Sequence, residues 1–213
     1  MGRILRAVFA VICALPVAAC SVFGDSNVEI AGYDVIEADG DIEVRRYERL
    51  VPATTPLPGG MEGERNAAFR RLFNYINGEN RAAREIDMTA PVLMGEDGAG
   101  ESIDMTAPVL IGENGGGPAM SFVLPASYTL DEAPQPTDPA VRLERIADWT
   151  VAAIRFTGLL STSNAATHRE RLSGWLAESE WRPSGPALVA GYNPPWTLPM
   201  FRRNEVLIPV QRR

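Results

Sequence analysis

This chain of 213 residues has few nitrogen and sulfur side chains that could act as nucleophiles or metal ligands. It has one histidine, His168, two cysteines, Cys13 and Cys20, and no lysine, so all 20 basic residues are arginine. The lack of lysine excludes Schiff-base chemistry and an amine nucleophile, and one histidine cannot supply a multi-histidine metal site. The sequence has no Walker loop, GxGxxG or GxSxG motif. The acidic residues show no spacing that isolates an acid/base pair, so we name no catalytic residue.

The single histidine falls in a helix that the apolar spacing predicts over residues 164–179. Its helical stripe also contains Ala165, Leu172, Trp175, Leu176 and Ser179. The His168 side chain should therefore point inward. A lone histidine on an apolar face is more often a packed residue than a ligand, and axial ligation of a metal by His168 stays open as the alternative.

The first 19 residues have the composition of a lipoprotein-type signal peptide. Arg3 and Arg6 precede an apolar stretch, residues 7–15, that is too short to cross a bilayer as a helix. The next four residues, Val-Ala-Ala-Cys, resemble a bacterial lipobox, which predicts cleavage before Cys20 and lipid on its sulfur. An ordinary secretory signal cut near residue 19 is the alternative. Because Ser21 stands where an aspartate would indicate inner-membrane retention, we expect a lipid-anchored envelope protein at the outer membrane, facing the periplasm.

Cleavage at this point leaves 213 − 19 = 194 residues, enough for one well-packed domain. We divide them into a tether, residues 20–32, and a single domain, residues 33–213. With Cys13 removed and Cys20 lipidated, the domain has no disulfide and no thiolate ligand. Loss of the two signal-peptide arginines changes the formal charge from −7 to −9. An acidic domain is a poor binder of nucleic acid, and we expect a monomer.

One 13-residue sequence segment occurs twice, with two differences, in the middle of the chain. Residues 86–98 read IDMTAPVLMGEDG and residues 103–115 read IDMTAPVLIGENG. Apolar and polar residues alternate in each copy, which is typical of a half-buried strand, and Pro91 and Pro108 predict edge strands or a bend. The turn-forming residues between the copies favour a hairpin. A local duplication with only structural value is the alternative.

The first half of the domain contains strands, one helix and further strands. Asp39-Gly40 is a strong hairpin signal between two strand-like runs. After a Gly59-Gly60 turn, a helix is predicted over residues 62–77. Its apolar stripe consists of Ala68, Phe69, Leu72, Phe73 and Ile76.

The second half repeats this order of elements. Strands are predicted in the runs VRLERI and WTVAAIRFTG before the helix at 164–179, and in ALVAGYN and EVLIPV after it. The order strand-strand-helix-strand-strand therefore occurs twice. We predict an α+β fold in which internally duplicated units form a curved or distorted antiparallel barrel with two flanking helices.

Four short motifs, taken together and in order, resemble the SOUL haem-binding protein family. They are Met88–Val92, Phe122–Tyr128, Ala133–Asp138 and Gly191–Val206. The resemblance covers residues 33–210. It implies a distorted barrel with two outer helices, and a haem b or other porphyrin ligand held non-covalently in a shallow apolar groove.

The resemblance also implies which residues form the groove, between the first helix and the loop before the last strand. By position they are Arg71, Leu72 and Tyr75 on the helix, and Tyr192, Trp196, Met200, Phe201 and Arg202 on the loop. Aromatic and aliphatic walls suit a flat macrocycle, and arginine suits its propionates. Where some family members have an axial histidine in an early strand, this chain has arginine, within residues 43–47. We therefore expect haem binding through the groove without a strong axial histidine.

The sequence leaves three possible functions from different classes. The first is an envelope lipoprotein that carries, buffers or scavenges haem or a related tetrapyrrole. The second is a small-molecule hydrolase, because the implied fold resembles that of GyrI-like effector-binding domains; a buried glutamate with a raised pKa would favour it. The third is an envelope interaction protein whose groove holds a peptide or a lipid.

Overall fold

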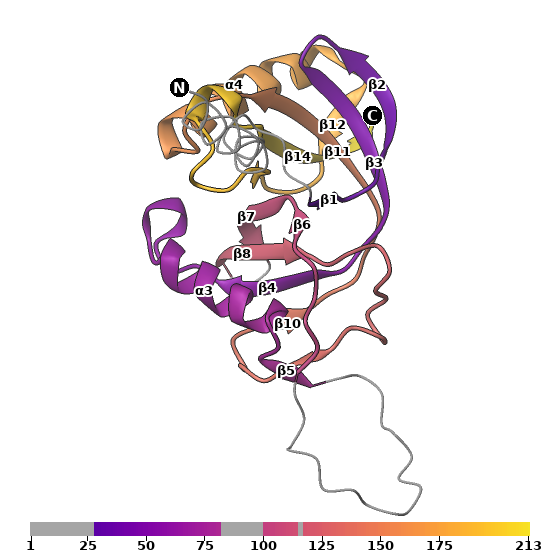
Figure 1. Ribbon diagram of the computed structural model, residues 1–213. Helices are drawn as coiled ribbons and strands as arrows, with labels where there is room; N and C mark the ends of the chain where they lie inside the picture. The colour runs from indigo at the N-terminus through magenta and orange to yellow at the C-terminus, as the bar shows by residue number, and fades with distance from the viewer. Residues whose placement is uncertain (1–27, 82–99, 115–116) are drawn as a thin grey trace, which may run out of the picture.

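One curled antiparallel sheet of ten strands organises the computed structural model, which describes residues 28–81, 100–114 and 117–213 (Figure 1). The strands of this sheet are β2 (Asp34–Asp39), β3 (Ile42–Leu50), β4 (Pro52–Pro56), β7 (Val109–Asn114), β8 (Gly117–Val123), β10 (Arg142–Leu143), β11 (Ile146–Phe156), β12 (Trp181–Pro183), β13 (Leu188–Gly191) and β14 (Asn204–Arg212). The sheet is an open half-barrel, which confirms the α+β prediction.

Shorter elements complete the fold. The helices are α3 (Arg65–Ile76) and α4 (Thr162–Glu178), with 3-10 turns η2 (Gly60–Glu62) and η3 (Pro199–Phe201). Two-residue strands pair outside the large sheet, β1 (Glu29–Ile30) with β6 (Thr106–Ala107) and β5 (Asn80–Arg81) with β9 (Gln135–Pro136). No helix among the described residues is long and apolar enough to span a membrane.

The predicted internal duplication is present, and its two units exchange strands. The strand order is β10-β4-β8-β7-β13-β14-β11-β3-β2. One unit places β4, β8 and β7 side by side, and the other places β11, β14 and β13 side by side, with β7 and β13 joined antiparallel at the centre. The strand that precedes each unit pairs with the other unit, β3 with β11 and β10 with β4. Neither unit is therefore a complete sheet without its partner.

Alternating side chains divide the core between the two faces of the sheet. One face carries α3 over a cluster that includes Phe122, and α4 over a cluster that includes Ile154. The opposite face holds a third cluster around Tyr47 and Leu207. Both helices lie on the same side of the sheet, α3 against β4 and β8 and α4 against β11 and β14 (Figure 1).

The first helix buries part of its predicted apolar stripe, namely Ala68, Leu72 and Ile76. Phe69 and Phe73, which the apolar stripe had placed inside, are 38% and 43% exposed. Tyr75 is buried in addition, and its hydroxyl donates a 2.9 Å hydrogen bond to the carbonyl of Pro134, which satisfies this polar atom inside the core.

The second helix confirms its predicted stripe. Ala165, Leu172 and Leu176 are buried against β11 and β14. The Ser161 hydroxyl caps the helix by accepting a bond from the amide of Asn164. The helix therefore starts two residues before the predicted position.

The second copy of the repeated phrase bends at its proline, as predicted. β6 ends before Pro108 and β7 begins after it. β7 is not an edge strand, because it lies between β8 and β13. The first copy, residues 86–98, and the signal peptide with Cys20 lie outside the described residues, as does the predicted hairpin between the copies.

The folded part of the chain begins earlier than residue 33. Glu29 and Ile30, which we had placed in the tether, pair with Thr106 and Ala107. Ala31 is buried in the cluster around Tyr47. The tether boundary at residue 32 is therefore corrected for these residues.

Candidate functional site

The loop before the last strand exposes an unusual number of large apolar side chains. Trp196 and Met200 are 65% and 66% exposed, and Leu198 and Phe201 are also exposed. A single exposed apolar residue needs no explanation, but a group of them on one loop marks a binding surface.

Polar contacts hold this loop in place from both sides. The Arg202 guanidinium donates to the carbonyls of Thr197 and Pro195, which ties the loop to itself. The amide of Gly158 donates to the carbonyl of Pro199 at 2.8 Å. The loop is therefore a shaped surface, and Arg202 is occupied with holding it.

The first helix contributes two more exposed rings. Phe69 and Phe73 stack with their ring centroids 6.0 Å apart, and Phe69 also meets the edge of Phe122 at 5.2 Å. They are one helical turn apart, and Phe69 is one turn from Arg65, so all three lie on one side of α3. Arg70, three residues before Phe73, is exposed beside them and forms no ion pair within the described part of the chain.

A bridge between the two segments brings these rings towards the loop. The Arg65 guanidinium reaches the carbonyl of Leu160 at 3.5 Å. Residues 158–160 also contact the loop through Gly158, and Leu159 between them is 58% exposed. We give the exposed large apolar side chains of these three linked segments one name, the apolar rim: Phe69, Phe73, Leu159, Trp196, Leu198, Met200 and Phe201. It holds seven of the ten large apolar side chains that are exposed in the described residues.

The helix residues predicted for the groove do not line this rim. Leu72 is fully buried in the core under α3, and Tyr75 is buried beside it. Arg71 is engaged below the helix, where it donates to the Thr55 hydroxyl at 2.9 Å and pairs with Asp138 at 3.2 Å. Phe69 and Phe73 are on the exposed side of the same helix, and Arg70 is exposed beside them. The predicted loop residues Trp196, Met200 and Phe201 are exposed, and their role in ligand binding stays a prediction.

Tyr192 is also buried, as part of a polar cluster on the face opposite the helices. Its hydroxyl donates to Glu205 at 2.7 Å. Arg45 forms two hydrogen bonds to the same carboxylate, at 2.6 and 3.1 Å, and Arg203 forms two more, at 2.9 and 2.7 Å. Tyr33 completes this Glu205 cluster, because the Arg45 guanidinium lies over its ring at 4.3 Å. Both carboxylate oxygens of Glu205 therefore accept two or more hydrogen bonds.

The electrostatics of the Glu205 cluster argue against a general acid. Burial by itself would raise the pKa of Glu205, but the hydrogen bonds and charge of Arg45, with the charge of Arg203, lower this pKa below its ordinary value. Burial and the neighbouring carboxylate raise the pKa of Tyr192 well above its ordinary value. The glutamate is thus held ionised and the tyrosine neutral.

His168 has two contacts that explain its inward position. Its ring stacks on Phe156 with centroids 4.3 Å apart. Its Nδ1 lies 2.9 Å from the carbonyl of Asn164, one turn earlier in the helix. No group of three or more potential metal ligands of the His, Cys, Asp and Glu types occurs in the described residues.

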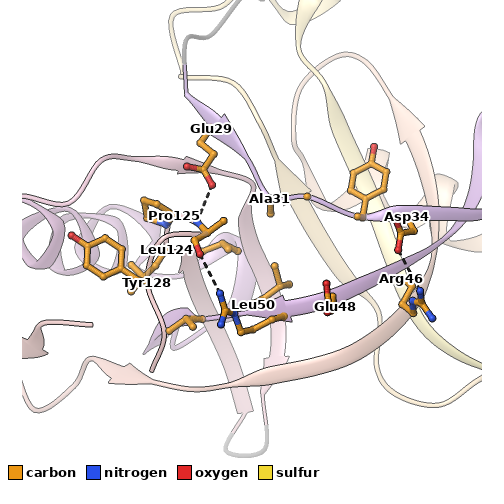
Figure 2. Close-up of a pocket in the computed structure, with 15 residues that line it drawn as sticks. Glu29, Ala31, Asp34, Arg46, Glu48, Leu50, Leu124, Pro125 and Tyr128 are labelled. Carbon is orange, nitrogen blue, oxygen red and sulfur yellow. Dashed lines mark hydrogen bonds and ion pairs between the residues drawn. The ribbon is translucent and has the colours of Figure 1, made fainter. Parts of the chain in front are cut away.

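A cavity of about 560 Å³ lies between β1, β3 and the loop after β8 (Figure 2). Four of its charged groups have partners in the protein. Arg46 pairs with Asp34 at 3.4 Å, Glu29 accepts from the amide of Ala126 at 2.8 Å, and Arg49 donates to the carbonyl of Ala126. These bonds join the N-terminal segment, the loop after β8 and the sheet. We therefore interpret the cavity as a space between packed segments and not as a ligand site.

A match to a protein family covers the segments that form the apolar rim. The model of the family described as SOUL heme-binding protein matches residues 28–209. The chain belongs to this family. None of the curated proteins matches the sequence.

Solved structures share the fold at low sequence identity. The C-terminal domain of EcmrR has a TM-score of 0.51 at 9% identity, and the match covers 85% of this chain and 99% of that domain. A hydrolase from Listeria innocua has a TM-score of 0.51 at 10% identity, covering 83% of this chain and 94% of that one. An uncharacterized conserved protein from Listeria innocua has a TM-score of 0.51 at 11% identity, covering 80% and 92%. At these identities the likeness is one of fold alone.

Proposed function

We propose that this protein binds haem b or a related tetrapyrrole at the apolar rim and serves as a carrier, buffer or scavenger of it. The observation that carries the proposal is the exposed aromatic surface of α3 and the loop at 193–203, in a chain of the SOUL family. A tetrapyrrole is a flat apolar plate, and exposed rings offer it stacking surface that the folded core does not use.

The charges around the rim fit a ligand with carboxylates at one edge. Arg70 lies beside Phe73 on α3 and has no ion-pair partner within the described residues. Such an arginine can form two parallel hydrogen bonds to a propionate. Arg71 and Arg202 are less suitable, because their guanidinium groups already bond Thr55 and the loop carbonyls.

We further propose that the ligand is held without a strong axial histidine. His168 packs on Phe156 and is not part of the rim. Changing His168 to alanine should therefore leave the affinity for haem within twofold. Abolition of the Soret shift by His168→Ala, in a protein that keeps its thermal transition, would identify His168 as an iron ligand and contradict the rim model.

The direct test is a titration of the protein with haem and with protoporphyrin, followed by absorbance and tryptophan quenching. Trp196→Ala should weaken the binding of both. Val35→Ala is the matched control, because Val35 is also an exposed apolar residue, 51% exposed on β2, away from the rim. Equal affinities for the two variants would place the site elsewhere.

The proposed location is the bacterial cell envelope, with the chain held by lipid on Cys20 at the outer membrane, facing the periplasm, as a monomer. The support is the lipobox-like Val-Ala-Ala-Cys sequence. Cys20→Ser should release the protein from the membrane fraction or block its processing. A mature-size Cys20→Ser protein that still sediments with membranes would contradict lipid anchoring.

A hydrolase is the second candidate, because a hydrolase from Listeria innocua shares the fold. Its expected acid would be a buried glutamate, and Glu205 is the buried glutamate of this sheet. The lowered pKa of Glu205 speaks against proton donation at neutral pH. Hydrolysis of small esters or electrophiles that is lost in a folded Glu205→Gln variant would reverse this judgement.

A further inference from the structure

A second cavity, of about 720 Å³, lies on the helix-bearing face between the two units. It is bounded by the turn before α3, by the first half of α4, by β7 and by β13. Its lining consists of Gly59, Gly60, Met61, Ile111, Gly112, Glu113, Pro118, Thr162, Ala165, Ala166, Arg169, Pro186, Ala187, Val189 and Val206. The volume lies within the range of small-molecule sites, about 300–1,000 Å³.

The chemistry of this lining differs from that of the apolar rim. All of its apolar side chains are aliphatic, and no aromatic ring lines it among the described residues. The buried floor is formed by Ile111 and Val206, which are 4% and 1% exposed. Such walls suit a flexible hydrocarbon chain, whereas a macrocycle gains most from aromatic planes.

The walls are built by local backbone features. Gly59 and Gly60 both have positive φ, 79° and 61°, which forms the tight turn at the mouth. On the other side, residues 162, 165, 166 and 169 occur at helical spacing, so α4 turns two alanines and one arginine towards the cavity. The two alanines leave the space open.

Two charges lie at the cavity, one on each side. Arg169 is on α4 and Glu113 is at the end of β7. Neither forms an ion pair within the described part of the chain, and they are not paired with each other. A ligand with an anionic head would gain a partner in Arg169, and Glu113 would repel the same head.

We propose that this cavity binds a single-chain aliphatic amphiphile, with its hydrocarbon against the aliphatic lining above Ile111 and Val206 and its anionic head at Arg169. A free fatty acid and an anionic lysophospholipid share this chemistry. The site is separate from the apolar rim, so this proposal stands or fails independently of tetrapyrrole binding.

The experiment uses the full-length Cys20→Ser chain, which removes the proposed lipid attachment. Isothermal titration calorimetry measures the binding of dodecanoate, 1-lauroyl-lysophosphatidylglycerol and dodecyltrimethylammonium. The two anions should bind more tightly than the cation of similar chain length. If the lysophospholipid binds more tightly than dodecanoate, the preferred ligand is a lipid with a phosphate headgroup. If dodecanoate binds more tightly, the preferred ligand is a free fatty acid. Lack of saturable binding by both anions would overturn the proposal.

Charge variants locate the head. Arg169→Gln should weaken dodecanoate about two- to fivefold, because Arg169 is exposed and its pair with a carboxylate is screened by solvent. Glu113→Gln should tighten it about twofold, because a like charge is removed. Arg142→Gln, an exposed arginine on β10, is the control and should change affinity less than twofold. Equal effects of the two arginine variants would overturn the placement at Arg169.

A filling variant locates the chain. Ala166→Trp should abolish dodecanoate binding, whereas Ala177→Trp, at an exposed position of the same helix, should not. If Ala166→Trp loses its thermal transition, Ala166→Leu replaces it, with at least a fivefold loss expected. Wild-type affinity in a folded Ala166 variant would overturn the proposal. Haem is titrated in parallel: Trp196→Ala should affect only haem and Ala166→Trp only dodecanoate, so failure at one site is distinguished from failure at the other.

Discussion

Two neighbouring stretches of the chain differ in the burial of their side chains. They are Trp196–Phe201 and Arg203–Glu205. The second is buried and places charged groups where each finds a partner, with Glu205 fully buried and bonded by Arg45, Arg203 and Tyr192. The first places large apolar groups in solvent, with Trp196 65% exposed.

This difference separates a structural role from a binding role. Burying charges is tolerated when hydrogen bonds saturate them, and here the result is a junction of β3, β13 and β14. Exposing apolar groups on a fixed loop gives no benefit to folding. We therefore expect changes at Glu205 to act on stability and changes at Trp196 to act on ligand binding.

The largest effect should come from breaking the buried cluster. Glu205→Gln removes the charge that Arg45 and Arg203 share, so we expect a loss of about 3–5 kcal/mol in the free energy of unfolding, measured by urea denaturation. The double variant Arg45→Met/Glu205→Leu is the control and should recover part of this loss. A loss below about 1 kcal/mol in Glu205→Gln would show that the cluster does not support the fold.

A matched pair on α3 compares a buried with an exposed apolar residue. Leu72→Ala should cost about 2–5 kcal/mol of unfolding free energy, because Leu72 is fully buried. Phe73→Ala, on the exposed face of the same helix, should cost less than about 1.5 kcal/mol and weaken haem binding. Similar costs for both variants would mean that the exposed face is packed in solution.

The rim should respond in affinity and not in stability. Trp196→Ala should weaken haem by about 1–3 kcal/mol, which is about 5- to 150-fold in Kd, with unfolding unchanged within about 0.5 kcal/mol. The Soret titration and the urea curve are recorded on the same preparation. An equal loss in stability would assign Trp196 to the fold instead.

The acid sensitivity of the fold should trace to Glu205. Its folded-state pKa lies below its unfolded value, so its stabilisation is complete above an ordinary pKa of 4.5 and is lost as pH falls through the lower, folded value. Thermal melts of the wild type should therefore drop below about pH 4.5, and those of Glu205→Gln should drop less. Parallel pH profiles for the two proteins would remove Glu205 as the cause.

The smallest effect should be that of the propionate partner. Arg70→Ala should weaken haem by about 0.2–1 kcal/mol, because an exposed ion pair is screened by solvent. The effect should shrink further at 1 M salt. An Arg70 effect that is independent of salt would point to a packing role for its aliphatic stem.

The sequence predicted the order of elements well and the buried face of α3 in part. The duplicated strand-strand-helix-strand-strand order, the turn at Gly40 and the face of α4 all follow from local patterns. The burial of Tyr75 does not, because its hydroxyl donates to the carbonyl of Pro134, which is distant in sequence. A periodicity cannot distinguish a buried tyrosine with a distant partner from a surface one.

The exposure of the candidate site residues could be predicted only in part, for the same reason. The family resemblance implied the loop residues Trp196, Met200 and Phe201, and the structure exposes all three. Arg71 and Tyr192 were misplaced because their partners, Asp138 and Glu205, are distant in sequence or lie on another strand. Arg70 was missed, although its neighbour was named, since one residue along a helix changes the direction of the side chain by about 100°.

The exchange of strands between the two units makes synthesis of the second half a condition for completing the first. The nine-residue strand β3 (Ile42–Leu50) pairs with β2 on one side, but β11, its antiparallel partner on the other side, begins only at Ile146. β4 likewise waits for β10 at Arg142. Non-local pairing of this kind slows folding and leaves open strand edges on a partly made chain. Split fragments of this protein should therefore fold only when mixed, and a nascent chain should depend on protection until residues 142–156 have emerged from the ribosome.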